Sequence, residues 1–313
     1  MNNTAKSLAL LSLAILLVKA QTDAQERDLI VRMTTPIEVH FRASVPNYGS
    51  AFYFQQLGPP ADPSKQEPQW RAITGLFLVT AKHVIEPSRI KSLISVKFYL
   101  RRPGVSGIDW LPITLSQQDV RERLHVDPNS AADIAALDIR DLVSGEMMKS
   151  MPKNPGSEEP HTVPIENYFA VTEDNFPNKS KIKVDAGDDV VVIGYPRQFF
   201  DSYNKLPILK SGLLITPVGV RYDNMDAFLI DFKEYEGMSG GVVISKPTDL
   251  TVEDDHILIK KGGKDFVFLG VYAGQRYRRG SATGEEKTAD VGIGWYYYNL
   301  ANAISSPPMF STK

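Results

Sequence analysis

The sequence contains no cysteine, and this absence excludes several kinds of chemistry. Disulfide bonds, catalysis by a thiolate and zinc sites built on cysteine all need this residue. A surplus of either charge is also missing, because 35 Lys and Arg residues stand against 37 Asp and Glu residues, for a net charge of −2. Proteins that bind nucleic acid or anionic membranes by electrostatics carry a basic surplus. We therefore expect no nucleic-acid partner.

Long apolar runs are missing except at the N-terminus. Residues Ser7 to Val18 form an apolar stretch that follows Lys6, and the segment V-K-A at residues 18–20 ends it. This stretch is shorter than the roughly 20 residues that cross a bilayer, and its flanks are typical of a secretory signal peptide. We predict that residues 1–20 are a signal peptide, cleaved after Ala20, and that the mature protein is secreted or periplasmic with no membrane span. The alternative is an uncleaved anchor.

Long amphipathic helices are scarce, whereas short strand-like runs are frequent. Many apolar runs have Gly, Pro, Asn or Asp close by, as strands bounded by turns do. The first run alternates around Ile37, Val39 and Phe41, which places His40 on the polar face. We expect an all-β fold of the barrel or sandwich type. One short helix is expected in the C-terminal segment N-L-A-N-A-I-S-S.

Two stretches rich in loop-forming residues interrupt the strands. Residues 45–70 are rich in Pro, Gly and Gln, and we expect a loop there. Residues 141–181 separate two groups of strands, each the size of a small six-stranded barrel. We therefore predict an N-terminal β-barrel at 28–140, a linker or insertion at 141–181, and a C-terminal β-barrel with the terminal helix at 182–305.

Three glycines surround a single serine in the segment G-M-S-G-G at residues 237–241. A serine nucleophile needs a nearby base, and it needs donors for the oxyanion that forms when it attacks a carbonyl group. Backbone N–H groups are suitable donors, and glycine permits the tight turn that makes them converge. Ser239 is the candidate nucleophile, and the N–H groups of Gly237 and Ser239 are the candidate donors. The alternative is a plain glycine-rich hairpin.

A histidine and an aspartate have suitable contexts to act with Ser239. His83 follows an apolar run in L-V-T-A-K-H-V, and imidazole can bond a serine through one nitrogen and a carboxylate through the other. Asp133 begins the run D-I-A-A-L-D-I and is the candidate carboxylate. Asp138 is the rival, but an odd separation places it on the opposite face of a regular strand. The alternatives are a structural role for His83 and a strand-entry cap for Asp133.

The segments T-A-x-H-V, D-I-A-x-L and G-x-S-G-G, in this order, resemble the trypsin/chymotrypsin-like serine peptidases. The likeness is closest to the cysteine-free bacterial HtrA/DegP-like branch. The runs at residues 187–196 and 268–274, and the closing G-I-G-W-Y-Y-Y-N-L-A-N-A-I, are also similar to strands of the second barrel in that family. The resemblance covers residues 65–305 apart from 141–181.

The resemblance implies two six-stranded Greek-key β-barrels of the chymotrypsin-like type. It implies that Ser239 attacks a peptide carbonyl, that His83 transfers the proton and that Asp133 holds the tautomer. The N–H groups of Gly237 and Ser239 would bind the oxyanion, with no metal and no cofactor. The expected function is a secreted serine endopeptidase acting on proteins or peptides. The alternative is a peptidase-fold binding protein without significant turnover.

The chain departs from the family pattern at several positions. Met238 stands where many members have an Asp that pairs with an N-terminus freed by zymogen cleavage, so we expect no such activation. No PDZ-type peptide-binding module is expected after Ile304, and we therefore expect a monomer.

The substrate pocket of the family maps onto four residues of this chain. Lys233 falls at the position of the pocket base, where its charge would favour an acidic side chain at the cleaved residue. The alternatives are that Glu234 and Glu236 neutralise this charge, or that a gap displaces Lys233 from the pocket base. Tyr272, Ala273 and Gly274 fall on the strand that lines the pocket. These four residues are candidate substrate-pocket residues.

Overall fold

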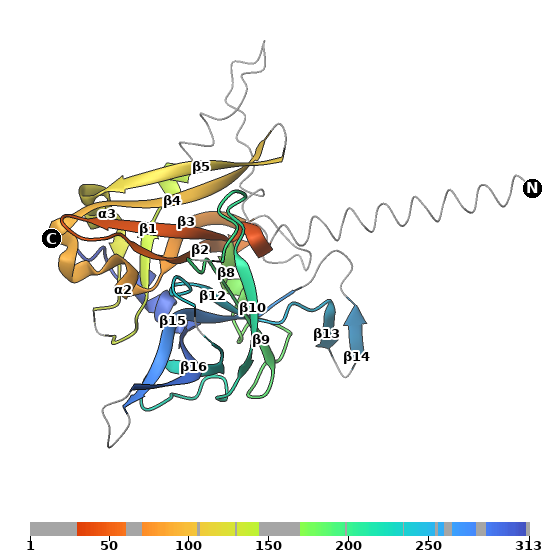
Figure 1. The fold of residues 1–313 in the computed structure, drawn as a ribbon. Helices are drawn as coiled ribbons and strands as arrows, with labels where there is room; N and C mark the ends of the chain where they lie inside the picture. Colours follow the sequence, from red (N-terminus) through yellow and green to blue (C-terminus); the bar gives the residue numbers. More distant parts are fainter. Residues whose placement is uncertain are drawn as a thin grey trace, which may run out of the picture.

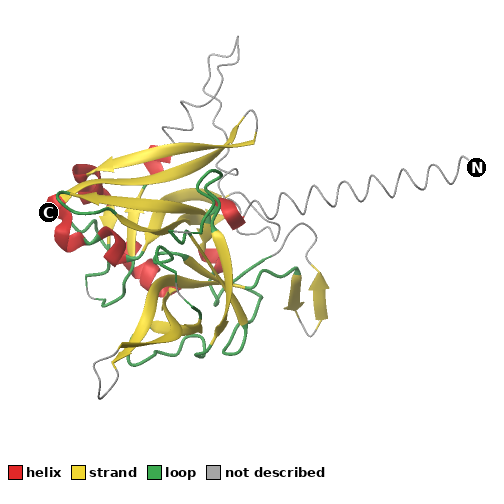
Figure 2. Ribbon diagram, viewed as in Figure 1, coloured by secondary structure: helices red, strands yellow, loops and turns green. Residues whose placement is uncertain are grey.

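The chain forms two β-sheet units that lie side by side (Figure 1). The structure is a computed structural model, and it describes residues 30–60, 71–104, 107–128, 130–143, 170–197, 199–233, 235–253, 256–259, 265–279 and 286–310. Strands make up most of both units, and the helices are short (Figure 2). The predicted signal peptide at residues 1–20 lies outside the described residues.

The first unit is a curved sheet of eight strands, with the order β5-β4-β1-β2-β3-β7-β6 and with β8 paired to β2. Its first strand shows why the sheet forms. Ile37, Val39 and Phe41 are buried, whereas Glu38 and His40 between them are half-buried, which is the alternation of a strand with one face on a core. The strands are β1 (Thr34–Phe41), β2 (Asn47–Pro60), β3 (Arg71–Thr80), β4 (Leu93–Gly104), β5 (Gly107–Ser116), β6 (Leu124–His125), β7 (Ala135–Asp138) and β8 (Val171–Thr172). The helices of this unit include α2 (Lys82–Ile85), η1 (Pro87–Ser92), α3 (Gln117–Arg123) and η3 (Glu173–Asn175).

The second unit is a closed barrel with the strand order β10-β11-β16-β15-β12-β9. Strand β9 is apolar on both faces because each face packs into a different apolar cluster. Val190 and Val192 belong to the apolar cluster inside the barrel, whereas Val191 and Ile193 belong to a second cluster between the two units. The strands are β9 (Asp189–Gly194), β10 (Ile208–Leu214), β11 (Ala227–Asp231), β12 (Val242–Ser245), β15 (Phe268–Arg279) and β16 (Glu286–Tyr296), followed by α5 (Tyr297–Ser305). A separate hairpin is formed by β13 (Leu250–Glu253) and β14 (His256–Ile259).

The cluster between the units holds them together as one body. Phe52 and Phe54 of β2 pack there with Phe268 of β15, and the rings of Phe52 and Phe268 lie 5.5 Å apart. Burying one such side chain stabilises the fold by about 1.5–3 kcal/mol. The contact therefore holds β2 of the first unit against the second unit.

The expected all-β architecture, with two barrel-type units and a short C-terminal helix, is confirmed. The first unit differs in detail from the expected six-stranded barrel, because its sheet has eight strands and the two ends of the sheet, β5 and β6, do not pair with each other. The helix α3 was not expected. It is short, and a capping box between Ser116 and Asp119 begins it. Within the described ranges, no helix has the length and apolar composition needed to cross a membrane.

The expectation of a loop at residues 45–70 is wrong for residues 47–60, which form β2. Glycine and proline lower strand propensity there, but the run from Ala51 to Phe54 is fully buried, and burial decides the outcome. The end of the expected linker also joins the first unit. Strand β8 pairs with β2, and Asp174 after it receives two hydrogen bonds from Arg71, at 2.9 and 2.7 Å.

The last described residues fold back onto the first unit, and the C-terminus lies beside α3 in Figure 1. The N–H of Met309 donates to the carbonyl oxygen of Leu124 at 2.7 Å, and Nδ1 of His125 lies 2.8 Å from the carbonyl oxygen of Ser306. The guanidinium of Arg121 sits 4.9 Å from the ring centre of Phe310. Residues 306–310 therefore cover the edge of the first sheet.

Candidate active site

His83 lies on α2, directly after β3, and it is in contact with Asp133 just before β7. One carboxylate oxygen, Oδ1, accepts a hydrogen bond from the backbone N–H of His83 at 2.8 Å, and Oδ2 lies 2.5 Å from His83 Nδ1. When Nδ1 carries the ring proton and donates a hydrogen bond to this carboxylate, Nε2 is the acceptor nitrogen of the ring. The side chain of His83 is 49% exposed, so the ring remains accessible.

Gly237 begins a tight turn in the second unit, with φ +97°. This is the left-handed region, which favours glycine. The carbonyl oxygen of Glu236 accepts a hydrogen bond from the N–H of Arg197 at 2.8 Å. The C=O and N–H of a trans peptide point in opposite directions, so the N–H of Gly237 points away from Arg197. A Cβ at Gly237 would lie only 2.6 Å from the carbonyl oxygen of Tyr195, so the turn requires glycine at this position.

The direction of the Ser239 N–H follows from the same reasoning, applied to the peptide between Met238 and Ser239. The carbonyl oxygen of Met238 accepts a hydrogen bond from the N–H of Gly241 at 2.9 Å, so the N–H of Ser239 points away from Gly241. Met238, Gly240 and Gly241 all donate their N–H groups to carbonyl oxygens. In the part of the chain that the structure describes, the N–H groups of Gly237 and Ser239 have no acceptor. Two unused donors on one turn are what an oxyanion site requires.

Gly240 brings this turn against the segment that leads to His83. Its φ is +85°, and a Cβ there would overlap the hydroxyl of Thr80 and lie 2.8 Å from the backbone N of Ala81. Both residues come directly before α2. The two units therefore meet backbone to backbone at this point, with no room for a side chain at residue 240.

Gly49 of β2 makes the corresponding contact next to Ser239. A Cβ at Gly49 would lie 2.9 Å from Cγ1 of Val84 and 3.1 Å from the carbonyl oxygen of Ser239. Val84 is the neighbour of His83 on α2. The structure thus brings Ser239 to the segment that carries the contact between His83 and Asp133, and all of the proposed catalytic residues lie around one junction of the two units.

Met238 is fully buried in the apolar cluster inside the second barrel. Its sulfur would lie 3.1 Å from a Cβ placed at Gly194, at the end of β9. The turn is therefore anchored to the barrel by packing at this position.

Of the expected pocket residues, Tyr272, Ala273 and Gly274 lie on β15 beside the turn. The N–H of Gly240 donates to the carbonyl oxygen of Tyr272 at 2.8 Å, and the N–H of Tyr272 donates to that of Gly241 at 2.9 Å. The pairing of β12 with β15 ends there. Among the described residues, no strand pairs with Ala273 or Gly274 on the side of the turn, so this piece of β15 is an edge.

The side chains of Tyr272 and Lys233 lie in opposite environments. Tyr272 is fully buried, and its ring packs edge-on against Phe232 at 5.0 Å. Lys233 is exposed, and its carbonyl oxygen accepts a hydrogen bond from Nζ of Lys210. Partial burial, followed by the positive charge of Lys233, lowers the pKa of Lys210, and Asp290 opposes this shift. Positive charge therefore gathers beside the exposed Lys233.

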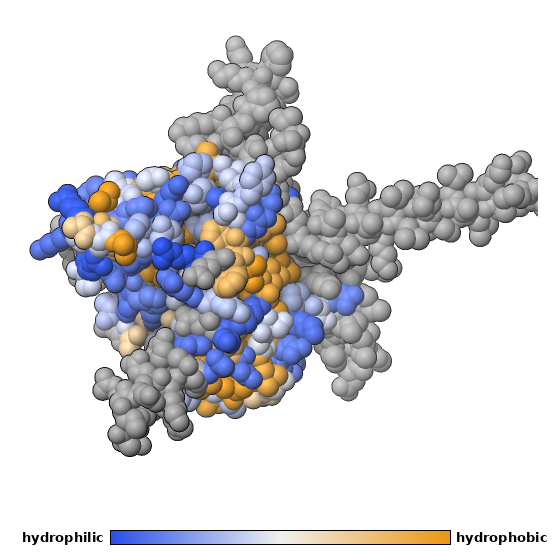
Figure 3. All heavy atoms as spheres, viewed as in Figure 1, coloured by the Kyte–Doolittle hydropathy of each residue, from blue (hydrophilic) through white to orange (hydrophobic). Residues whose placement is uncertain are grey.

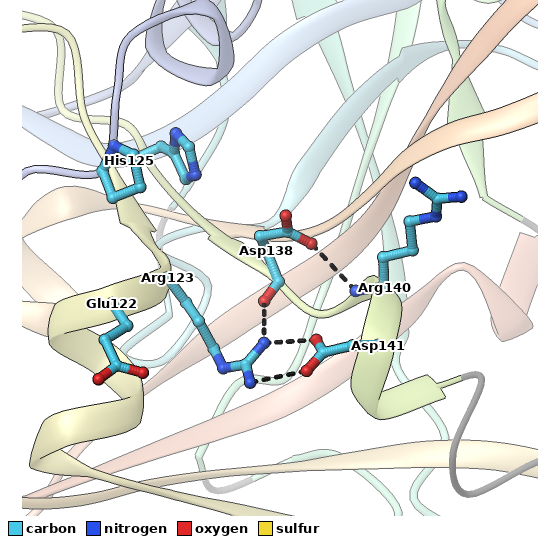
Figure 4. Close-up of a pocket in the computed structure, with 7 residues that line it drawn as sticks. Glu122, Arg123, His125, Asp138, Arg140 and Asp141 are labelled. Carbon is cyan, nitrogen blue, oxygen red and sulfur yellow. Dashed lines mark hydrogen bonds and ion pairs between the residues drawn. The ribbon is translucent and has the colours of Figure 1, made fainter. Parts of the chain in front are cut away.

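A charged pocket of about 490 Å³ lies elsewhere, on the first unit (Figure 4). Arg123 donates two parallel hydrogen bonds to Asp141, at 2.5 and 2.9 Å. Both bonds are drawn in Figure 4. Asp138 also lines this pocket and accepts a hydrogen bond from the N–H of Arg140 at 3.1 Å. Of the two carboxylates considered as partners of His83, Asp133 is therefore the one that contacts it.

The surface of the second unit is partly apolar. Figure 3 shows apolar side chains on the face that carries β9 and β10, and Leu209 and Leu213 of β10 are exposed.

Within the described ranges, no group of three or more His, Asp or Glu side chains is arranged to hold a metal ion.

Comparison with known proteins gives similarity in fold only. No family model matches the chain, and no curated protein matches it. The structure of Deg5 is 13% identical, with a TM-score of 0.42, over 94% of this chain and 98% of that chain. The protease Anisep from Arthrobacter nicotinovorans is 14% identical, with a TM-score of 0.39, over 87% of this chain and 96% of that chain.

The closed six-stranded barrel, the second β-sheet unit beside it and the short C-terminal helix match the architecture expected of a chymotrypsin-like fold. Sequence identities this low bear on the fold alone, and TM-scores below 0.5 add no weight to any functional conclusion.

Ser50 is a residue at this site that sequence reasoning missed. Its N–H donates to the carbonyl oxygen of Ser239 at 2.8 Å, and its own carbonyl oxygen accepts a hydrogen bond from the hydroxyl of Thr80 at 2.7 Å. It lies in the stretch that was expected to be a loop. The run A-F-Y-F directly after it was the available signal, because it identifies a buried strand.

Proposed function

We propose that this protein is a serine peptidase that hydrolyses peptide bonds through an acyl-enzyme. One combination of features carries the proposal. The contact between His83 and Asp133 and the two unused N–H donors, on Gly237 and Ser239, meet at the same junction of the two units. A structural histidine or a plain hairpin would require neither the oriented donors nor this junction.

The proposed residues divide the reaction as follows. Ser239 Oγ attacks the carbonyl carbon while its proton passes to Nε2 of His83, and the N–H groups of Gly237 and Ser239 hold the oxyanion. The peptide C–N bond then breaks as His83 returns the proton to the leaving amine. Water then attacks the carbonyl carbon of the acyl-enzyme while its proton passes to Nε2 of His83. The ester bond to Ser239 Oγ breaks, His83 returns the proton to Oγ, and the carboxylic acid product leaves. Oδ2 of Asp133 accepts the hydrogen bond from Nδ1 of His83 and so holds this tautomer of the ring.

A peptide is the substrate that fits the edge of β15. An extended chain can add to an exposed sheet edge through main-chain hydrogen bonds. Ala273 and Gly274 provide such an edge directly beside the turn that carries Ser239. The backbone of β15 would thus align the acyl side of the substrate. A preference for acidic residues through Lys233 stays a prediction, which cleavage of a peptide library tests.

Export is a separate part of the proposal, because the apolar segment at residues 1–20 lies outside the described residues. Its charge and length support removal by a signal peptidase. N-terminal sequencing of the exported protein is expected to begin at Gln21. Recovery of the intact N-terminus with the membrane fraction would favour an uncleaved anchor.

Labelling with a fluorophosphonate probe tests the proposed chemistry directly, because the probe reacts with an activated serine. We expect labelling of the unaltered protein, no labelling of Ser239→Ala, and normal labelling of Ser245→Ala. Ser245 is a matched control because it is a buried serine on β12, outside the turn. A folded, unaltered protein that stays unlabelled from mildly acidic to mildly alkaline pH would contradict the proposal and favour a peptidase-fold binding protein.

A further inference from the structure

We propose that Ser50, a residue of the first unit, is the positioning residue for the oxyanion site of the second unit. The inference rests on the proposed function of Ser239 and adds a residue to it. Ser50 lies on β2 and is fully buried. Its place on another unit, far from residues 237–241 in the sequence, makes it a specific connection between the two halves of the molecule.

The hydroxyl of Ser50 uses both of its hydrogen-bonding roles. It accepts a hydrogen bond from the N–H of Tyr195 at 2.7 Å, and it donates to the carbonyl oxygen of Gly237 at 2.7 Å. A serine hydroxyl has one proton to donate. Because the N–H of Tyr195 occupies one side of the oxygen, that proton is directed to Gly237.

This bond fixes the peptide that follows Gly237. The carbonyl group of Gly237 is held by Ser50, and the N–H of Met238, on the opposite side of the same peptide, donates to the carbonyl oxygen of Tyr235 at 3.1 Å. The backbone N–H of Ser50 also holds the carbonyl oxygen of Ser239 at 2.8 Å. Ser50 therefore contacts both residues whose N–H groups form the proposed oxyanion site.

Glycine at residue 237 makes such a restraint necessary. Glycine has more conformational freedom than any other residue, so its peptides rotate easily when a bond is lost. Among the described residues, the hydroxyl of Ser50 is the one donor to the carbonyl oxygen of Gly237. The site is also closely packed, since a Cβ at Gly194 would lie 2.6 Å from the hydroxyl oxygen of Ser50. A small side chain with a hydroxyl group satisfies both conditions.

The test compares Ser50→Ala with the matched control Ser245→Ala. Ser245 is also buried, and its hydroxyl accepts a hydrogen bond from the N–H of Val267 at 2.9 Å, so its loss removes a bond of the same kind away from the turn. We expect Ser50→Ala to lose more thermal stability than Ser245→Ala, because its hydroxyl makes two hydrogen bonds and that of Ser245 makes one. Only Ser50→Ala is expected to lower kcat and the rate of fluorophosphonate labelling, by about 10-fold to 100-fold, with KM nearly unchanged.

A second variant and a second measurement keep the inference testable. Ser50→Gly retains the backbone bonds and removes the hydroxyl without adding atoms, so we expect the same loss of kcat from it. Hydrogen exchange of the Met238 N–H in a Ser239→Ala background needs no activity, and it is expected to be faster when Ser50 is changed to Ala than when Ser245 is.

The outcomes separate the two proposals. Equal kcat in the Ser50 and Ser245 variants, or equal exchange at Met238, would overturn the role of Ser50 while leaving the peptidase proposal intact. An unlabelled parent protein in which Met238 still exchanges faster without the Ser50 hydroxyl would overturn the peptidase proposal instead.

Discussion

Replacing Gly240 with alanine tests the contact that joins the two units at the candidate site. The residue has φ +85°, and a Cβ there would overlap the carbonyl oxygen of Ser50 and the hydroxyl of Thr80, and would lie 2.8 Å from the backbone N of Ala81. Two of these atoms are backbone, and the third is a buried, bonded hydroxyl. The turn must therefore shift away from the first unit.

The expected loss of unfolding free energy in Gly240→Ala is the sum of two contributions. An alanine in left-handed backbone costs about 1–2 kcal/mol. Forcing a methyl group into a filled contact costs about 1–3 kcal/mol more. We therefore expect Gly240→Ala to lower the free energy of unfolding by roughly 2–5 kcal/mol. Gly219→Ala is the matched control, because φ at Gly219 is +79° and nothing lies within 4 Å of the added Cβ.

Urea denaturation of both variants measures these contributions, and their difference isolates the steric one. The labelling rate of the folded Gly240→Ala protein is also expected to fall, because Ser239 moves with the turn away from the segment that carries His83. Equal unfolding free energies for Gly240→Ala and Gly219→Ala would refute the steric reasoning. Normal labelling of a destabilised Gly240→Ala protein would refute the link to the site.

Three further changes test other parts of the structure. Asp133→Asn keeps an acceptor for the backbone N–H of His83 but favours the wrong tautomer, so the labelling rate is expected to fall by about 10⁴-fold; a fall below tenfold would contradict the assigned role. Met238→Ala leaves a cavity in the barrel and is expected to cost about 2–5 kcal/mol in urea denaturation, whereas an unchanged midpoint would show that the turn is not anchored there. Arg123 holds the pKa of Asp141 below its ordinary value, so the stability it adds is present above that ordinary value and is lost as pH falls through the folded-state pKa. We expect this effect on stability to be small because Asp141 is largely exposed. Acid is expected to destabilise the parent protein more than the Asp141→Asn variant. Equal pH dependence of stability in the two proteins would contradict the role of the Arg123–Asp141 pair.

The sequence predicted those parts of the molecule that follow from local pattern. The alternation around Ile37 predicted β1, and the glycines beside Ser239 predicted a tight turn, because both signals lie within a few residues. It failed at β2, where glycine and proline are locally unfavourable and burial against distant strands decides the structure.

The residue that holds the turn in place could not be predicted from the sequence, for a related reason. Ser50 bonds to Gly237 across a large sequence separation, and no local pattern records which serine lies opposite a given carbonyl group. The contact between His83 and Asp133 also joins distant residues, but each of the two carries a recognisable context of its own. The residues proposed to react can thus be found from short motifs, whereas the residues that hold them in place are found from the fold.

The return of the C-terminal tail to the first unit affects how the protein is made. Met309 bonds to Leu124, yet the ribosome synthesises Leu124 long before Met309. At about 5–20 residues per second, the edge strand β6 waits roughly 10–40 s for the tail that covers it. During that interval the sheet presents an uncovered edge, which is the kind of surface that chaperones bind and that nascent chains use to aggregate.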